Sequence, residues 1–374
     1  MRKKFSRYER PTEDTRQAFR ISPIDLDILE AVLCYRFSPA SELRRLIGHN
    51  PTVVAKRLRF LWEHEYINRF AFPDIRFRAT ESHYYLDDRK ALDVLHRHGR
   101  LQDIHPTMQE EIDNNRKADY ANAAVKHQHM KLGFLHHELM ISRLRFMLEM
   151  ACRQSGGRVE LSMFRRGADL EGHKVEVPEV RSRRVAGSNA YRWEESRHDT
   201  RFLPVEPDAI FTLRFHRLPS PDAPADGGQA ALGQSFHFCY EADRGTMPPA
   251  DMLRKFRAYY YFIKKHRKHV EAFGIHPIRA VLVEAPDETR ALKLMEIAGH
   301  PLVSGPNKRV GMFWFTISSL FTAPIEHEGR KMPKYLIEPQ VVFDREWALP
   351  DLPAGQAGFT KLALGDVENS PAGS

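Results

Sequence analysis

The chain has 374 residues, with 57 Lys and Arg against 49 Asp and Glu, a formal net charge of +8 and a hydrophobic fraction of 42%. This length is typical of two or three domains, and this hydrophobic fraction excludes a wholly disordered chain. No apolar run of about 18 residues occurs, so the sequence predicts no transmembrane span and no membrane partner.

The cysteines and the first residues predict a cytoplasmic protein. Cys34, Cys152 and Cys239 are far apart and none stands in a Cys-x-x-Cys spacing. This pattern argues against a disulfide framework and a structural zinc, and it fits a reducing compartment. The basic N-terminal residues are not followed by an apolar segment, so we expect no secretory signal. The positive net charge favours a polyanionic partner, although a basic enzyme would show the same balance.

Residues 20–100 are predicted to form a winged helix-turn-helix domain. Ser22 and Pro23 are typical of a helix start, and apolar residues then recur at helical spacing. We expect a second, short helix capped by Ser38 and a third helix over residues 52–66. Helix, short helix, turn and helix is the order of a helix-turn-helix unit.

Alternating apolar and basic residues after the third helix predict a β-wing, with residues 82–86 as its returning strand. The third helix of such a unit enters the major groove. Residues 1–100 hold 20 Lys and Arg against 14 Asp and Glu, so we expect double-stranded DNA as the partner; a winged helix used for protein contacts is the alternative. The DNA-binding candidates in this domain are Lys56, Arg57, Arg59, Arg76 and Arg78.

Residues 131–345 predict a second, mixed α/β domain, which makes the fold class α+β and multidomain. Its expected elements are a helix over 132–152, strands over 158–164, 206–213 and 236–242, a helix over 249–273, a strand over 278–284, a helix over 288–298 and a strand over 312–316. The charged residues 165–200 predict an irregular hairpin or loop. The remaining segments are a basic flexible arm at 1–19, a linker at 101–130 and a loose tail at 346–374.

Acidic residues occur where two predicted strands of this domain meet. Asp208 opens one strand, and Glu241 and Asp243 end the next. Antiparallel neighbours place the start of the first strand beside the end of the second. Clustered carboxylates need a cation, and oxygen ligands suit Mg²⁺ or Mn²⁺. A capped turn beside a solvated strand end is the alternative, and the pattern does not decide between the two.

Four segments carry a resemblance to a known family: His136-His137-Glu138, Pro207-Asp208-Ala209, Glu241 to Thr246, and Lys255 to Tyr259. Over about residues 20–300 the chain resembles the replication-relaxation family of plasmids and mobile elements. That family pairs an N-terminal winged helix with a PD-(D/E)xK restriction-endonuclease-like domain. It is similar to MobC-type relaxases, which nick plasmid DNA at a transfer origin.

The resemblance implies a set of catalytic residues. Asp208 and Glu241 would be metal ligands, with Asp243 beside them as a third candidate, and Glu138 matches an acidic residue of the first core helix. The superfamily's lysine is replaced by Asp243, but Lys255 on the following helix could reach the site. We therefore expect a metal-dependent DNA nickase acting on a plasmid origin, and the chain could form a homodimer. The alternative is a sequence-specific replication or transcription regulator with an inactive nuclease-like domain.

The helix predicted from Pro249 is strongly basic. Residues 251–270 hold seven Lys and Arg and one acidic residue, and tyrosines interrupt the run. A basic face that carries aromatic residues suits phosphate contact and base stacking, whereas the alternative is the solvated face of an amphipathic helix. The DNA-binding candidates here are Arg254, Arg257 and Lys264.

Overall fold

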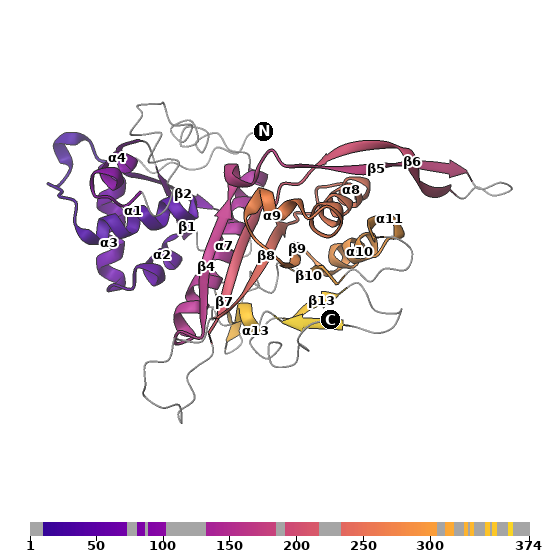
Figure 1. Cartoon of the computed structure of the whole chain (residues 1–374). Helices are drawn as coiled ribbons and strands as arrows, with labels where there is room; N and C mark the ends of the chain where they lie inside the picture. Colours follow the sequence, from indigo (N-terminus) through magenta and orange to yellow (C-terminus); the bar gives the residue numbers. More distant parts are fainter. Residues whose placement is uncertain are drawn as a thin grey trace, which may run out of the picture. The chain divides into compact units, whose positions relative to one another are not determined.

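The computed structural model contains helices and mixed sheets, which confirms an α/β protein (Figure 1). It describes residues 10–72, 81–86, 89–101, 132–184, 191–216, 233–304, 311–317, 325–327, 330–332, 341–344, 346–349 and 358–361. The predicted DNA contacts Arg76 and Arg78, residues 102–130 of the predicted linker and most of the predicted tail lie outside the described residues. Two units are distinguished, Met1–Phe146 with Glu326–Leu336, and Met147–Ile325 with Ile337–Ser374.

The first unit combines helices with a small antiparallel sheet. In chain order it contains η1 (Glu13–Thr15), α1 (Pro23–Tyr35), β1 (Ser38–Pro39), α2 (Ala40–Ile47), α3 (Pro51–Glu63), β2 (Ile67–Phe72), β3 (Glu81–Leu86), α4 (Arg89–Arg97) and the first turns of α7 (Leu132–Gln154). The sheet order is β1-β3-β2. The three predicted helices and the strand predicted over residues 82–86 are confirmed.

Local sequence explains where these helices begin. Ser22 forms a capping box with Asp25 at the start of α1, and the Asn50 side chain accepts the Thr52 N–H at 2.9 Å at the start of α3. The prediction that Ser38 caps the second helix is wrong. Ser38 pairs with Tyr84 as part of β1, because its backbone is recruited by a strand that lies far away in sequence.

The second unit is built on a seven-stranded sheet of order β14-β13-β10-β9-β8-β7-β4. Its strands are β4 (Val159–Arg166), β7 (Ala209–Phe215), β8 (Gln234–Ala242), β9 (Ile278–Ala285), β10 (Phe313–Ile317), β13 (Glu346–Leu349) and β14 (Gly358–Lys361). β4, β7 and β8 are antiparallel neighbours, whereas β8, β9 and β10 are parallel. The five strands predicted between residues 158 and 316 are confirmed, whereas β13 and β14 lie in the segment predicted as a loose tail and are instead part of the sheet.

Helices contribute buried residues to the second unit. They are α8 (Pro249–Tyr260), α9 (Lys268–Phe273), α10 (Glu288–Ala298), α11 (Pro301–Ser304) and α13 (Val341–Asp344), with the shorter η2 (Gly167–Leu170), β11 (Ile325–His327) and β12 (Arg330–Met332) elsewhere in the chain. Phe256 of α8 packs on Phe313 and Phe315 of β10. α8 therefore lies against the sheet through its apolar face.

The single helix predicted over residues 249–273 is instead three segments. α8 is followed by a π-helical turn, η3 (Tyr261–Lys265), and α9 begins only after Arg267. Arg267 adopts a left-handed conformation with φ of 50°, which breaks the helical path. Apolar residues keep a helical spacing through this break, so the sequence pattern did not indicate that the helix is interrupted.

Residues 174–184 and 191–204 form two paired strands, whose register shifts once between Pro178 and Val180, where an irregular hairpin or loop was expected. β5 (Lys174–Arg184) pairs with β6 (Tyr191–Pro204) as a separate two-stranded antiparallel sheet beside α8 (Figure 1). Val175, Val177 and Leu203 are buried and belong to the same core cluster as α8. The many charged residues between them hid this period-two pattern in the sequence.

A search of the helices in the described ranges found none with the length and apolar character that crossing a membrane requires.

Candidate active site

Asp208 lies beside the end of β8, as the antiparallel pairing predicted. It occupies the bend before β7, and Ala209 is the register partner of Tyr240. Its backbone N–H donates to the Tyr240 carbonyl at 3.1 Å, and its Oδ2 accepts the Ala242 N–H at 2.7 Å. These two bonds fix Asp208 next to the strand that carries Glu241.

Glu241 is buried on β8 and is held by two side chains of α8. Its Oε2 accepts a hydrogen bond from Lys255 Nζ, and its Oε1 accepts one from the Tyr259 hydroxyl. Lys255 and Tyr259 are four residues apart and therefore project from the same face of the helix. Sequence reasoning found Lys255 but missed Tyr259, which this spacing could have indicated.

Burial and neighbouring charge set the protonation of this cluster. Burial raises the pKa of Glu241 to about 7, with Lys255 opposing this shift and the negative charge of Asp208 adding to it. Burial alone would lower the pKa of Lys255, but Glu241 and Asp208 outweigh it and the pKa is raised. Burial, together with Glu241, raises the pKa of Tyr259 well above its usual range. Lys255 therefore stays an ammonium and Tyr259 a hydroxyl donor at neutral pH.

The stability of the metal-free protein should depend on pH through Glu241. Its pKa is higher in the folded protein (about 7) than its ordinary value of 4.5. The stabilisation is thus complete below the lower value and is lost as pH rises through the higher one. Between about pH 5 and pH 8, the unfolding free energy of the wild type should fall by about 2–3 kcal/mol relative to Glu241→Gln.

Urea unfolding of both proteins in a chelator-containing buffer, repeated at several pH values, measures this difference. The quantity compared is the change of unfolding free energy with pH in the wild type and in Glu241→Gln. The contribution of histidines that titrate in both proteins therefore cancels. A constant difference across the pH range would contradict the raised pKa of Glu241.

Asp243 does not join Asp208 and Glu241. Arg290 of α10 binds it through Nε at 2.7 Å and Nη2 at 3.1 Å, and also donates to the Met247 carbonyl at 2.9 Å. Within the described ranges, no group of three or more His, Cys, Asp or Glu side chains could hold a metal ion. The expected three-carboxylate ligand set is therefore reduced to Asp208 and Glu241.

Sequence reasoning also missed Glu284, a buried carboxylate at the end of β9. Its Oε2 accepts the Tyr240 hydroxyl at 2.8 Å, and its carbonyl accepts the Asp243 N–H at 2.9 Å. Because β8 and β9 are parallel, their carboxyl ends lie at one edge of the sheet. The sequence did offer a signal for Glu284, because this acidic residue ends the strand predicted over residues 278–284.

Glu138 has a partner within the first unit. It is buried on α7, and its Oε2 accepts a hydrogen bond from Arg36 Nη1 at 3.0 Å. Glu138 is assigned to the first unit, whereas Asp208 and Glu241 belong to the second. A catalytic role for Glu138 stays a prediction.

The predicted DNA contacts on α3 divide into exposed and structural residues. Lys56 is exposed and lies over the Phe60 ring, and the Arg59 side chain is 70% exposed and paired with Glu63. Arg57 instead forms an ion pair with Asp25, whose side chain is 0% exposed. Arg57 therefore serves the packing of α1 against α3, and it is not a free DNA contact.

The basic residues of the second unit divide in the same way. Arg254 is about half exposed and Lys264 is exposed. Arg257 is only 3% exposed, and it binds the carbonyls of Leu302 and Pro178. The expectation that Arg257 points to solvent is wrong, because the β5–β6 hairpin and α11 cover that side of α8.

Comparison with curated proteins and with solved structures found no match. A family model described as replication-relaxation matches residues 29–277, which is more than half of the chain and includes α3, Asp208, Glu241 and Lys255. The sequence resemblance is therefore confirmed at the level of the family. The chain belongs to the replication-relaxation family.

Proposed function

We propose that this chain binds double-stranded DNA of a plasmid or other mobile element and nicks it at a metal-dependent site formed by Asp208, Glu241 and Lys255. The observation that carries the proposal is the hydrogen bond from Lys255 to Glu241, next to Asp208 at the edge of the sheet. Two carboxylates with an adjacent ammonium suit hydrolysis of a phosphodiester.

The strand order of the second unit supports a nuclease-like fold. β4, β7 and β8 are antiparallel, and α8 then leads to the parallel strand β9. This order resembles the core of the PD-(D/E)xK superfamily, with Asp208 at the start of the second strand and Glu241 in the third. Lys255 would take the place of the lysine for which this chain has Asp243.

The carboxylates fit a Mg²⁺ or Mn²⁺ ion chemically. Each oxygen of Glu241 accepts one hydrogen bond and has a second lone pair, so both can still act as ligands. Asp208 and Glu241 would hold the ion, which when bound supplies positive charge for the phosphate and a reactive water. Lys255 would offset negative charge that develops on the phosphate oxygens, and Tyr259 would keep Glu241 in place.

The structure of the first unit supports a DNA-binding role. Its order α1, β1, α2, α3, β2 and β3 is that of a winged helix, whose recognition helix would be α3. Lys56 and Arg59 lie on the exposed side of this helix. They are the basic residues of α3 that we assign to DNA contact, and Arg57 is withdrawn from that set.

The variant Lys56→Ala should weaken duplex binding about three- to ten-fold and reduce by about one the slope of log affinity against log salt. The loss of one phosphate contact and its counterion release explains both effects. Fluorescence anisotropy with a labelled duplex over a range of salt concentrations measures them. Lys293→Ala, an exposed lysine of α10, is the matched control and should leave the slope unchanged. Equal slopes for all three proteins would exclude Lys56 from the interface.

A second candidate function is sequence-specific binding without cleavage. Asp243 stands at the superfamily's lysine position and is occupied by Arg290, which favours a nuclease scaffold that has lost its activity. Such a regulator would bind its origin tightly and leave DNA intact.

Incubation of a supercoiled plasmid carrying the cognate origin separates the two functions. With Mg²⁺ or Mn²⁺, the nickase proposal predicts conversion to the open circle, which EDTA should prevent. Retarded but uncleaved plasmid in both metals would favour the regulator.

A further inference from the structure

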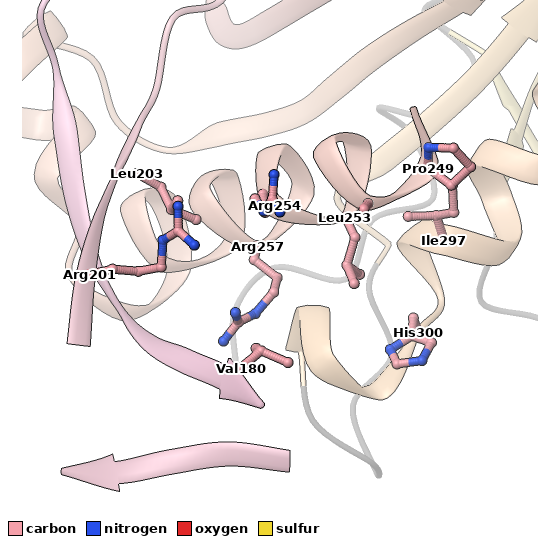
Figure 2. A pocket seen from close by; sticks show the side chains of 10 residues that line it. Val180, Arg201, Leu203, Pro249, Leu253, Arg254, Arg257, Ile297 and His300 are labelled. Atoms are coloured by element: carbon pink, nitrogen blue, oxygen red, sulfur yellow. The ribbon is translucent and has the colours of Figure 1, made fainter. Parts of the chain in front are cut away.

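A cavity of the second unit lies on the side of α8 away from Lys255 and Tyr259. It has a volume of about 430 Å³ and lies between the β5–β6 hairpin, α8 and the segment after α10 (Figure 2). Its lining residues are Val180, Arg201, Leu203, Pro249, Ala250, Leu253, Arg254, Arg257, Ile297 and His300. Lys255 and Tyr259 are absent from this lining because they bind Glu241. The cavity is therefore separate from the acidic site.

The walls of the cavity are mostly apolar. Val180, Leu203, Leu253 and Ile297 contribute aliphatic side chains, and α8 adds its first residues. Cavities of 300–1,000 Å³ with such walls bind small organic molecules. The volume is sufficient for an organic molecule about the size of a mononucleotide.

The polar side chains of the lining are all hydrogen-bond donors. Three are arginines and one is His300, and no acidic residue contributes. His300 Nδ1 accepts the Leu302 N–H at 3.2 Å, which assigns the proton of the neutral ring to Nε2. Burial lowers the pKa of His300 and so favours that neutral form. Acceptor groups of an occupant would match these donors, although Arg254 and Arg257 are also paired with Asp251 and Glu195.

Arg257 is a donor that the protein has fixed in place. Its Nε donates to the Leu302 carbonyl at 2.8 Å, and its Nη2 donates to the Pro178 carbonyl at 3.1 Å and Glu195 Oε1 at 2.7 Å. Its guanidinium also lies over the Tyr261 ring, 5.9 Å from the ring centroid. Figure 2 shows the guanidinium extending from α8 toward Val180. Little entropy would be lost when this group binds a ligand.

Two further arginines supply charge at the cavity. Arg201 is exposed on β6 and forms no ion pair with any described residue. Arg254 pairs with Asp251, but both side chains are about half exposed, and such pairs are weak. Figure 2 shows Arg201 extending from its strand toward α8, which carries Arg254. Both side chains line the same cavity.

We propose that this cavity binds a phosphomonoester with a body about the size of a mononucleotide. The phosphate would accept hydrogen bonds from Arg201, Arg254 and Arg257. The organic part of the phosphomonoester would lie against the aliphatic walls. A phosphomonoester carries up to two charges and three terminal oxygens, which guanidinium groups match in geometry. The same chemistry has two sources, a free nucleotide and the 5′-phosphorylated end of a DNA strand.

Calorimetric titration of the full chain, without added metal, tests the proposal with three probes. They are dAMP and a short single-stranded oligonucleotide with either a 5′-phosphate or a 5′-hydroxyl. Arg201→Gln should weaken phosphate-dependent binding about ten-fold. Leu253→Trp, which fills the cavity without changing its charge, should weaken it as well. Arg197→Gln, an exposed arginine of the same strand outside the lining, should leave it unchanged.

The outcomes assign the source or overturn the proposal. Preference for the 5′-phosphorylated over the 5′-hydroxyl oligonucleotide, lost in Arg201→Gln, identifies a DNA end. Binding of dAMP alone, lost in the same variant, identifies a free nucleotide. Absence of both, or equal losses in Arg201→Gln and Arg197→Gln, overturns it. The inference does not rest on the nickase proposal, since duplex binding and plasmid nicking are measured separately.

Discussion

Replacement of Glu241 by Gln or of Asp208 by Asn is expected to lower the rate of plasmid nicking by about 100-fold or more. Each substitution removes a negative charge that the proposed mechanism needs to bind the metal ion. A rate decrease of this size is typical when one catalytic group is removed. The amide variants have nearly the size and shape of the carboxylates, so Tyr259 and the Ala242 N–H can keep their acceptors. The initial rate of open-circle formation measures the effect.

Asp251→Asn provides the matched control. Asp251 is a half-exposed carboxylate on α8, paired with Arg254 outside the acidic site, and its replacement should leave the nicking rate within about two-fold of the wild type. If the first unit binds the DNA, duplex affinity should be the same in the wild type and in the three variants. Nicking that survives both site substitutions would show that the cleaving residues lie elsewhere.

The variant Arg57→Ala should destabilise the protein by about 3 kcal/mol or more. Asp25 is fully buried, and Arg57 is its ion-pair partner. Removal of one member leaves a buried charge without its partner, which is more costly than the ion pair itself is stabilising. Arg57 also donates to the Arg20 carbonyl at 2.9 Å and lies over the Phe19 ring, so its loss also loosens the segment before α1.

Thermal and urea unfolding of the full chain measure this loss, with Lys56→Ala as the control. Lys56 is exposed on the same helix, and its removal should change stability by less than about 0.5 kcal/mol. Equal effects of the two substitutions would contradict a structural role for Arg57. If the prediction holds, lost DNA binding in an Arg57 variant reports unfolding and says nothing about the interface.

The sequence was sufficient to predict most of the helices and strands and the proximity of Asp208 to Glu241. The helices and strands follow from local periodicity and caps such as Ser22 with Asp25. The two acidic residues come together because consecutive antiparallel strands leave little choice of neighbour. Lys255 was expected near them only through the family resemblance, because Asp243 stands at the superfamily's lysine position and a lysine on the following helix could reach the site.

The choice of ionic partners could not be predicted in the same way. Arg290 is 47 positions from Asp243, and Arg57 is 32 positions from Asp25. No local pattern says which of many arginines will meet a given carboxylate, because that depends on how elements pack. Arg257 was misplaced for the same reason, because the carbonyls that it binds, those of Leu302 and Pro178, are 45 and 79 positions away in the sequence.

The ability of Asp208 and Glu241 to hold a divalent cation is the claim on which the account depends most. Titration of the full chain with Mn²⁺, followed by the loss of the free-ion electron paramagnetic resonance signal, measures it without knowledge of the DNA site. We expect saturable binding by the wild type that is lost in Glu241→Gln and kept in Asp251→Asn. Equal Mn²⁺ binding by the wild type and Glu241→Gln, or none by the wild type while it nicks plasmid, would contradict the assignment.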